Sequence, residues 1–157
     1  MTDAQLPLGE LAGVPDRIAL LARADPEILE LVHAALGQLW VAHGDVDDVL
    51  RIRFETSVVE ILGNIIEHAY RVDLALPDAA RSRRFQLVLG VTADKVVAVF
   101  GDNGLPVALD LGNLEMPDAD AESGRGLPLA RAALDVLEYE RVGASNVWRL
   151  EAHRTAT

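Results

Sequence analysis

Apolar side chains recur at two different periods along this chain, and the change of period separates helical segments from extended ones. A helical spacing of apolar positions runs from residue 26 to 42, and a longer one runs from about 45 to 70. Asp25 before Pro26 is typical of a helix start, because the carboxylate can accept hydrogen bonds from free amides. Asp45 is the expected start of the second helix. The apolar content of this second helix predicts that it is the central, buried one.

The remaining apolar stretches alternate as strands do. Strands are predicted at residues 17–22, 85–91, 96–100, 138–142 and 147–151. The first of these is expected at a sheet edge, the pair 85–91 and 96–100 forms the clearest hairpin, and a helix is predicted from about 126 to 137. Helices followed by such strands predict an α+β two-layer sandwich, in which a mixed, mostly antiparallel sheet is covered on one face by about three helices.

Two segments lack a regular pattern. Residues 1–14 contain one proline and two glycines and are expected to form a loosely held N-terminal leader, followed by a single domain over residues 15–157. Residues 105–123 contain two prolines and one glycine with weak periodicity. We interpret this second segment as a long mobile loop.

Composition narrows the class of protein. The 157 residues, half of them hydrophobic, suffice for one domain with a substantial core. The formal net charge of −11 repels phosphate backbones and anionic lipids, so nucleic acid and membranes are not expected as partners. The chain has no cysteine, which excludes disulfides, thiol catalysis and cysteine-ligated metals and fits a reducing compartment. The sequence shows no signal-peptide pattern, and no apolar run approaches the roughly 20 residues that a membrane span requires. We therefore expect a soluble cytoplasmic protein.

Three polar segments interrupt the apolar pattern, and the first lies on the long helix. Glu60, Asn64 and His68 follow one another at intervals of four residues and therefore share one helix face. A carboxylate and an amide oxygen on one face can hold Mg²⁺ with its waters and provide a proton acceptor, as phosphoryl transfer requires. The alternative is a stripe of solvent-facing residues, and interruption of an otherwise apolar helix favours the site. For His68 alone we favour a satisfied packing residue or a helix-end group.

The second and third segments lie beside predicted strand and helix ends. Asp102 follows a strand, where its carboxylate can accept a hydrogen bond from the adenine amine, and Gly104 allows the backbone to approach the base. A simple turn is the alternative for this segment. Gly124, Arg125 and Gly126 open a helix, where free amides and the helix dipole attract phosphate oxygens. Here the alternative is a flexible lead-in to the helix.

Together, the three segments resemble the motif boxes of the GHKL (Bergerat-fold) ATP-binding superfamily. The stretches that carry the resemblance are residues 59–70 (VEILGNIIEHAY), 102–106 (DNGLP) and 123–130 (SGRGLPLA). Within this superfamily the chain is most similar to the bacterial anti-sigma-factor serine/threonine protein kinases of partner-switching systems. The resemblance covers about residues 15–153 and implies a Bergerat-type ATP-binding fold for the domain.

The resemblance also implies a role for each motif residue, with ATP and Mg²⁺ as cofactors. Asn64 would be the Mg²⁺ ligand, and Glu60 would be the catalytic general base. Asp102 would bind the adenine amine, with Gly104 beside the base. The remaining nucleotide-binding residues would be Gly124, Arg125, Gly126 and Leu127, with residues 105–123 as the ATP lid.

The function implied by the resemblance is that of an anti-sigma-factor-type regulator. Such a protein sequesters a sigma factor or a similar partner, and it phosphorylates a serine or threonine of a STAS-type anti-anti-sigma protein. A homodimer is a possible assembly. A sensor histidine kinase is disfavoured, because its dimerising helix with a phosphoacceptor histidine would have to precede the ATP domain.

Two features of the sequence bear on whether such a site hydrolyses or transfers phosphate from ATP. Gly63 sits inside the long helix, where glycine costs roughly 1 kcal/mol unless something packs closely against it. The expected lid at residues 105–123 carries five acidic residues and no lysine or arginine, so Arg125 and Mg²⁺ must supply the positive charge. The acidic lid motivates an alternative, a non-catalytic GHKL-fold module that sequesters a regulatory partner with weak or no ATP turnover. A further alternative is an unrelated α/β domain in which the three segments coincide by chance.

Overall fold

The computed structural model describes residues 6–73, 83–107, 111 and 126–155. The strands are β1 (Ile18–Arg23), β2 (Arg84–Val91), β3 (Lys95–Asp102), β4 (Val136–Val142) and β5 (Ser145–His153). The helices are the 3-10 helix η1 (Gly9–Gly13) and the α-helices α1 (Ile28–Ala42), α2 (Asp48–Asp73) and α4 (Gly126–Ala133). The five strands form one sheet in the order β1-β2-β3-β5-β4, and all four pairings are antiparallel.

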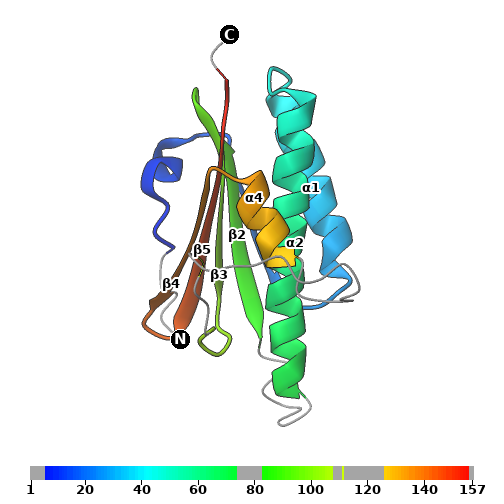
Figure 1. Cartoon of the computed structure of the whole chain (residues 1–157), viewed down its shortest axis with the longest axis vertical. Helices are drawn as coiled ribbons and strands as arrows, with labels where there is room; N and C mark the ends of the chain where they lie inside the picture. The colour runs from blue at the N-terminus through cyan, green and yellow to red at the C-terminus, as the bar shows by residue number, and fades with distance from the viewer. Residues whose placement is uncertain (1–5, 74–82, 108–110, 112–125, 156–157) are drawn as a thin grey trace.

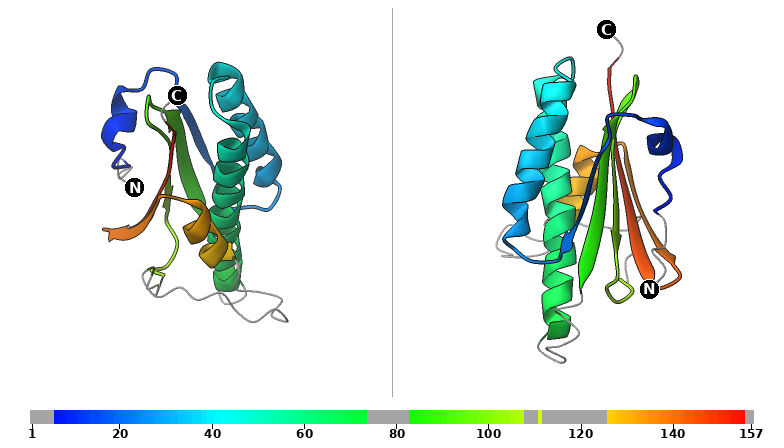
Figure 2. Two further views of the ribbon diagram at one scale, coloured as in Figure 1. Left: turned by 45° about the horizontal axis from the view of Figure 1, so that its top comes forward. Right: turned by 180° about the vertical axis from the view of Figure 1, so that it is seen from behind.

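The sheet and the α-helices form two layers, which confirms the predicted α+β sandwich (Figure 1). Helices α1, α2 and α4 lie on one face of the sheet, while η1 lies on the other (Figure 2). Helix α2 is central, since Phe54, Val58 and Ile61 on its inner side are fully buried in the core. Among the described residues, no helix combines the length and the apolar character that crossing a membrane requires.

An aspartate carboxylate binds backbone amides at or before the start of each long helix, although not where we expected. Asp25 Oδ1 accepts a hydrogen bond from Glu27 N at 3.0 Å, but this bond lies in the turn before α1. The helix starts at Ile28, two residues later than predicted, and its N-cap Glu27 makes no side-chain capping bond. At α2 the prediction was wrong. The capping residue is Asp47, whose Oδ2 accepts hydrogen bonds from the amides of residues 49 and 50 at 3.0 and 3.2 Å. Asp45 instead forms an ion pair with Arg154.

Helix α4 is shorter than predicted. Its last helical hydrogen bond runs from Leu134 N to Ala130 O, and at the next residue Asp135 N already donates to Glu151 O in the sheet. The apolar spacing of a helix continues in the sequence, because Leu137 lies three residues after Leu134. Both leucines are buried. Leu137 reaches the core from strand β4, so an extended segment continues the apolar pattern of the helix.

Residues 6–14 pack against the outer face of the sheet, contrary to the loose leader expected there (Figure 2). Leu6 and Leu11 are buried there, in a cluster whose sheet residues are Val88, Val97, Val99 and Val147. Both leucines sit over glycines. A Cβ added to Gly90 would lie 2.5 Å from Leu11 Cδ2, and one added to Gly101 would overlap the end of Leu6. The sheet therefore has pits that fit these side chains.

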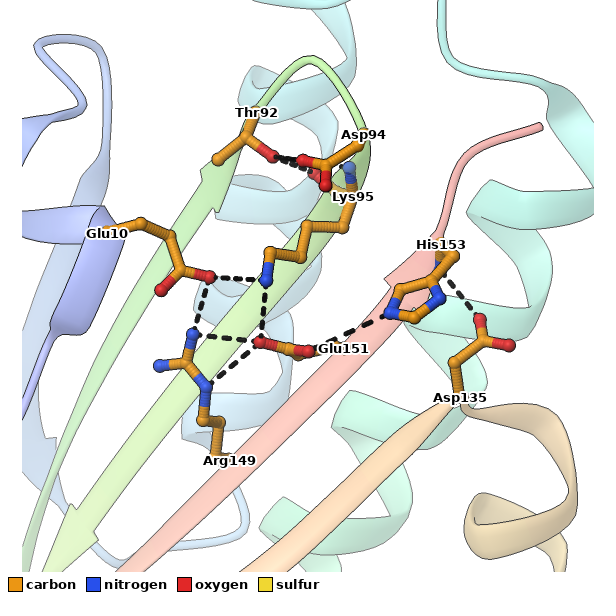
Figure 3. A network of polar contacts seen from close by, with 8 residues as sticks. All are labelled: Glu10, Thr92, Asp94, Lys95, Asp135, Arg149, Glu151 and His153. Carbon is orange, nitrogen blue, oxygen red and sulfur yellow. Dashed lines mark hydrogen bonds and ion pairs between the residues drawn. The ribbon is translucent and has the colours of Figure 1, made fainter. Parts of the chain in front are cut away.

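Ion pairs hold the same segment to strands β3 and β5 (Figure 3). Glu10 Oε1 lies 2.8 Å from Lys95 Nζ and 2.7 Å from Arg149 Nη2, and both cations also contact Glu151. The hydrogen bond from Lys95 is the main cause that lowers the pKa of the Glu10 carboxyl to about 2, and Arg149 adds to it. The domain boundary at residue 15 stays a prediction.

Candidate nucleotide-binding site

A cavity of about 170 Å³ lies between the C-terminal half of α2 and one end of the sheet. Its lining includes Asn64 and His68 of α2, Asp102 and Gly104 at the end of β3, Leu127 of α4, and Trp148 of β5. Each of the three predicted segments thus contributes at least one residue to the same cavity. Gly124 and Arg125 lie outside the described residues.

Asp102 is the last residue of β3 and is only 8% exposed. Its Oδ1 accepts hydrogen bonds from Gly104 N at 2.8 Å and from Asn146 Nδ2 at 2.9 Å. Nothing in the described part of the chain donates to Oδ2, which leaves that oxygen for a ligand. Burial raises the pKa of Asp102, and the two hydrogen bonds partly offset that rise. The bond from Gly104 N closes an Asx turn, so this segment is both the turn and the site.

Gly104 is needed beside this carboxylate. A Cβ at position 104 would lie 2.7 Å from Asp102 Oδ1 and 3.8 Å from His68 Cδ2. Any larger residue would push the carboxylate out of its place.

Asn64 and Glu60 meet the start of helix α4. Asn64 Nδ2 donates to Glu60 O at 3.0 Å, so Oδ1 is the atom of the Asn64 amide that remains without a partner among the described residues. A Cβ on Gly126 would overlap Glu60 Oε2 and would lie 3.9 Å from Asn64 Nδ2. The first residue of α4 therefore lies directly against the polar face of α2.

The acceptor atoms suit a nucleotide with Mg²⁺. Within the described ranges, no group of three or more histidine, aspartate or glutamate side chains could enclose a metal ion. Mg²⁺ bound to substrate phosphates needs only one or two protein oxygens and keeps several waters. One free amide oxygen at Asn64 is compatible with that mode of binding.

Three residues that were not among the predicted site residues also line this cavity. His68 is not the satisfied packing residue that we favoured, because its buried Nε2 has no hydrogen-bond partner among the described residues. Trp148 is buried in the core, yet it lines the cavity, and its Nε1 has no partner among the described residues either. Arg83 lines the cavity and donates to Asn103 O, while its buried Nε has no partner among the described residues. Buried polar atoms normally have partners, and these three unpartnered atoms all belong to residues that line the cavity.

The sequence contained one signal for these residues. His68 shares its helix face with Glu60 and Asn64, which the four-residue spacing shows. Trp148 and Arg83 reach the cavity through the pairing of strands, which no local pattern reports.

A comparison with protein families agrees with this geometry. The family model described as histidine kinase-like ATPase domain matches residues 22–151, a span that runs from β1 into β5 and contains all three segments. This match excludes a chance coincidence of the three segments in an unrelated domain. No curated protein matches the chain. The chain belongs to the family of histidine kinase-like ATPase domains, and with it to the GHKL superfamily of ATP-binding domains.

Proposed function

We propose that this domain binds Mg²⁺-ATP in the cavity and transfers the γ-phosphoryl group to a serine or threonine of a small partner protein. The observation that carries the proposal is the meeting of the three segments. Asn64 shares one cavity with Asp102, and Gly126 lies against Glu60 beside it. A base-recognising carboxylate and a phosphate-handling face thus adjoin a single cavity.

The free carboxylate oxygen of Asp102 suits the recognition of adenine. In the ionised carboxylate, Oδ2 accepts a hydrogen bond from the 6-amino group of adenine. Guanine carries a carbonyl oxygen at that position, which the carboxylate repels. Trp148 and His68 line the same cavity as Asp102.

Helix α2 and the start of α4 provide the groups that would bind the phosphates and Mg²⁺. Asn64 Oδ1 would hold the Mg²⁺ ion, and the free amides at the start of α4 would face the phosphates. Bound Mg²⁺-ATP supplies the phosphoryl group and the cation that neutralises its charge. Glu60 takes the proton from the acceptor hydroxyl, so its carboxylate must stay free to point at that hydroxyl.

The partners are proposed from the resemblance alone. In the resembling kinases, a STAS-type anti-anti-sigma protein is the phosphoryl acceptor and a sigma factor is the sequestered protein. The proposed location is the cytoplasm, and the assembly can include a homodimer.

The experiment combines the purified chain, Mg²⁺-ATP and an anti-anti-sigma protein from the same cell, and follows labelled phosphate into serine or threonine. Asn64→Ala should lose Mg²⁺-dependent ATP affinity. Glu60→Gln should keep ATP affinity but lose transfer by about 10²-fold or more. If the folded wild-type chain shows no ATP binding in calorimetry, the proposal is wrong.

The alternative of a non-catalytic binding module rests on the five acidic residues and the absence of lysine and arginine in residues 105–123. The same experiment separates the two. Tight ATP binding that Asn64→Ala abolishes, combined with no transfer to any antagonist, would favour sequestration without turnover.

A further inference from the structure

Asn146 lies behind the proposed base site and uses its whole hydrogen-bonding capacity. It is 1% exposed, and on β5 it pairs with Asp102 of β3 on one side and with Arg141 of β4 on the other. Its Nδ2 donates to Asp102 Oδ1 and to Leu105 O, both at 2.9 Å. Its Oδ1 accepts from Tyr139 Oη at 2.5 Å and from Arg141 Nη1 at 3.0 Å. An asparagine amide offers two donors and two acceptor positions, and all four are occupied.

The same side chains hold the backbone that follows Asp102. Arg141 Nη1 donates to Gly104 O at 2.7 Å, and Val107 N donates to Tyr139 Oη at 3.0 Å. Together with the bond to Leu105 O, side chains of β4 and β5 bind three backbone groups between residues 104 and 107. This stretch is where the expected lid begins.

The bond from Asn146 also decides which carboxylate oxygen faces a ligand. Because Oδ1 of Asp102 is occupied by Asn146 Nδ2 and Gly104 N, the carboxyl plane is fixed and Oδ2 is the free acceptor. Without Asn146, only the bond from Gly104 N would restrain the carboxylate. Two hydrogen bonds from different directions fix a carboxyl plane far better than one does.

We propose that Asn146 is a positioning residue for adenine recognition. It sets the orientation of the Asp102 carboxylate, and through Tyr139 and Arg141 it joins that carboxylate to the backbone of residues 104–107. Base recognition and the start of the lid are thereby held as one unit. The inference rests on the proposed function in one respect, the binding of ATP at Asp102.

A purely structural role for Asn146 predicts something different. If the residue only satisfied buried polar groups, its loss would weaken every nucleotide equally. A positioning role acts through the adenine amine, so a nucleotide without that amine should be affected less.

The test compares ATP with purine riboside triphosphate, which has the same sugar and phosphates but lacks the 6-amino group. Calorimetry gives the Kd of both ligands for wild type, Asn146→Ala and Tyr139→Phe. Asn146→Ala should weaken ATP at least about tenfold more than the purine analogue, which corresponds to the loss of a hydrogen bond to a charged group. Tyr139→Phe keeps the ring and loses one hydroxyl, and should reduce the preference for ATP by about threefold.

A pH profile supplies a second readout. The hydrogen bond from Asn146 is among the contacts that lower the pKa of Asp102, so its loss should move the acid limb of ATP affinity to higher pH. Other charged groups near the carboxylate stay in place in the variant; they are Glu67 and His68 of α2, Arg83 just before β2, Arg84 of β2, and Arg141 of β4.

Ser57→Ala is the matched control. Ser57 is a fully buried polar residue, but it does not line the cavity, so its loss should leave the preference for ATP and the acid limb unchanged. Suppose that wild type binds ATP, and that Asn146→Ala and Tyr139→Phe each raise the Kd of the two nucleotides by the same factor. Asn146 then has no positioning role, and the proposed function stands. If Asn146→Ala does not fold, the ratio measured for Tyr139→Phe decides. No binding of ATP to wild type would overturn the proposed function itself.

Discussion

Asp102 is a buried acid, and at the scale of one residue this makes its effects on folding and on binding opposite in sign. Burial raises its pKa above the ordinary value of 3.8, so the native state binds a proton more tightly than the unfolded chain. Its contribution to stability therefore falls as the pH rises from about 3.8 through the raised native pKa, and is level above it. ATP affinity should rise over the same window, because the ionised carboxylate is the acceptor for the amine.

Asp102→Asn should remove this pH dependence and weaken ATP binding by about 10- to 100-fold, as expected for losing a hydrogen bond to a charged group. Calorimetric titrations between pH 4 and 8 check both effects. Unchanged ATP affinity in a folded Asp102→Asn variant would show that the adenine ring does not bind at Asp102.

Gly126 and Gly63 form a matched pair for testing Glu60. A Cβ at Gly126 would overlap Glu60 Oε2, the end of a flexible side chain, so Gly126→Ala should fold while turning the carboxylate away. Phosphoryl transfer should fall by about 10²-fold with a smaller loss of ATP affinity. Gly63 has no described atom within 4 Å of a Cβ, so Gly63→Ala should add about 0.5–1 kcal/mol of stability with no change in transfer. Transfer assays and urea unfolding of both variants provide the comparison.

The same residues show how far sequence alone predicts the site. Glu60 and Asn64 could be placed together because four residues along a helix return to the same face. Asn146 could not be placed with Asp102, since the two are 44 positions apart and meet only through the pairing of β3 with β5. Strand register is decided by tertiary packing, and a local pattern does not report it.

At the scale of elements, the apolar period predicted which segments are helices and strands, whereas the ends depended on capping and on neighbours. Asp45 and Asp47 are both suitable caps by residue type, and the structure uses Asp47 for α2. Helix α4 ends at Ala133 because the next residues join the sheet, although Leu137 prolongs the helical spacing.

The cap of α2 gives a prediction of its own. Asp47→Ala should lower the free energy of unfolding by about 1 kcal/mol, because two amides of the first turn lose their acceptor. Asp47→Asn should restore most of it. Asp45→Ala removes an ion pair with Arg154 in which Asp45 is well exposed, and should cost less. Urea unfolding of the three variants checks the order, and a larger loss for Asp45→Ala would contradict the assignment.

At the scale of the whole molecule, the ion pairs of Glu10 connect the N-terminal segment to the sheet and respond to acid. The lowered pKa of Glu10, about 2 against an ordinary 4.5, means that the unfolded chain takes up the proton first as the pH falls. The stabilisation is complete above about pH 4.5 and is lost as the pH drops towards 2. Glu10→Gln should therefore lower the Tm at pH 7, and the difference from wild type should shrink below pH 4.5. A constant difference across this range would show that the charge on Glu10 is not the cause.

The N-terminal segment was the part of the fold that its sequence predicted least well, because its glycines and proline suggest a loose chain while its leucines fill pits in the sheet. Leu11 is fully buried over Gly90, so Leu11→Ala should cost about 2–5 kcal/mol, whereas Leu21→Ala, at a side chain that is 69% exposed, should cost little. Deletion of residues 1–14 should go further and expose the valine cluster of the outer sheet face, with a lower Tm and self-association in sedimentation. If the truncated chain melts like wild type and stays monodisperse, the segment is the dispensable leader that composition suggested. If it melts lower, residues 6–14 belong to the folded domain, and the boundary at residue 15 must move towards the N-terminus.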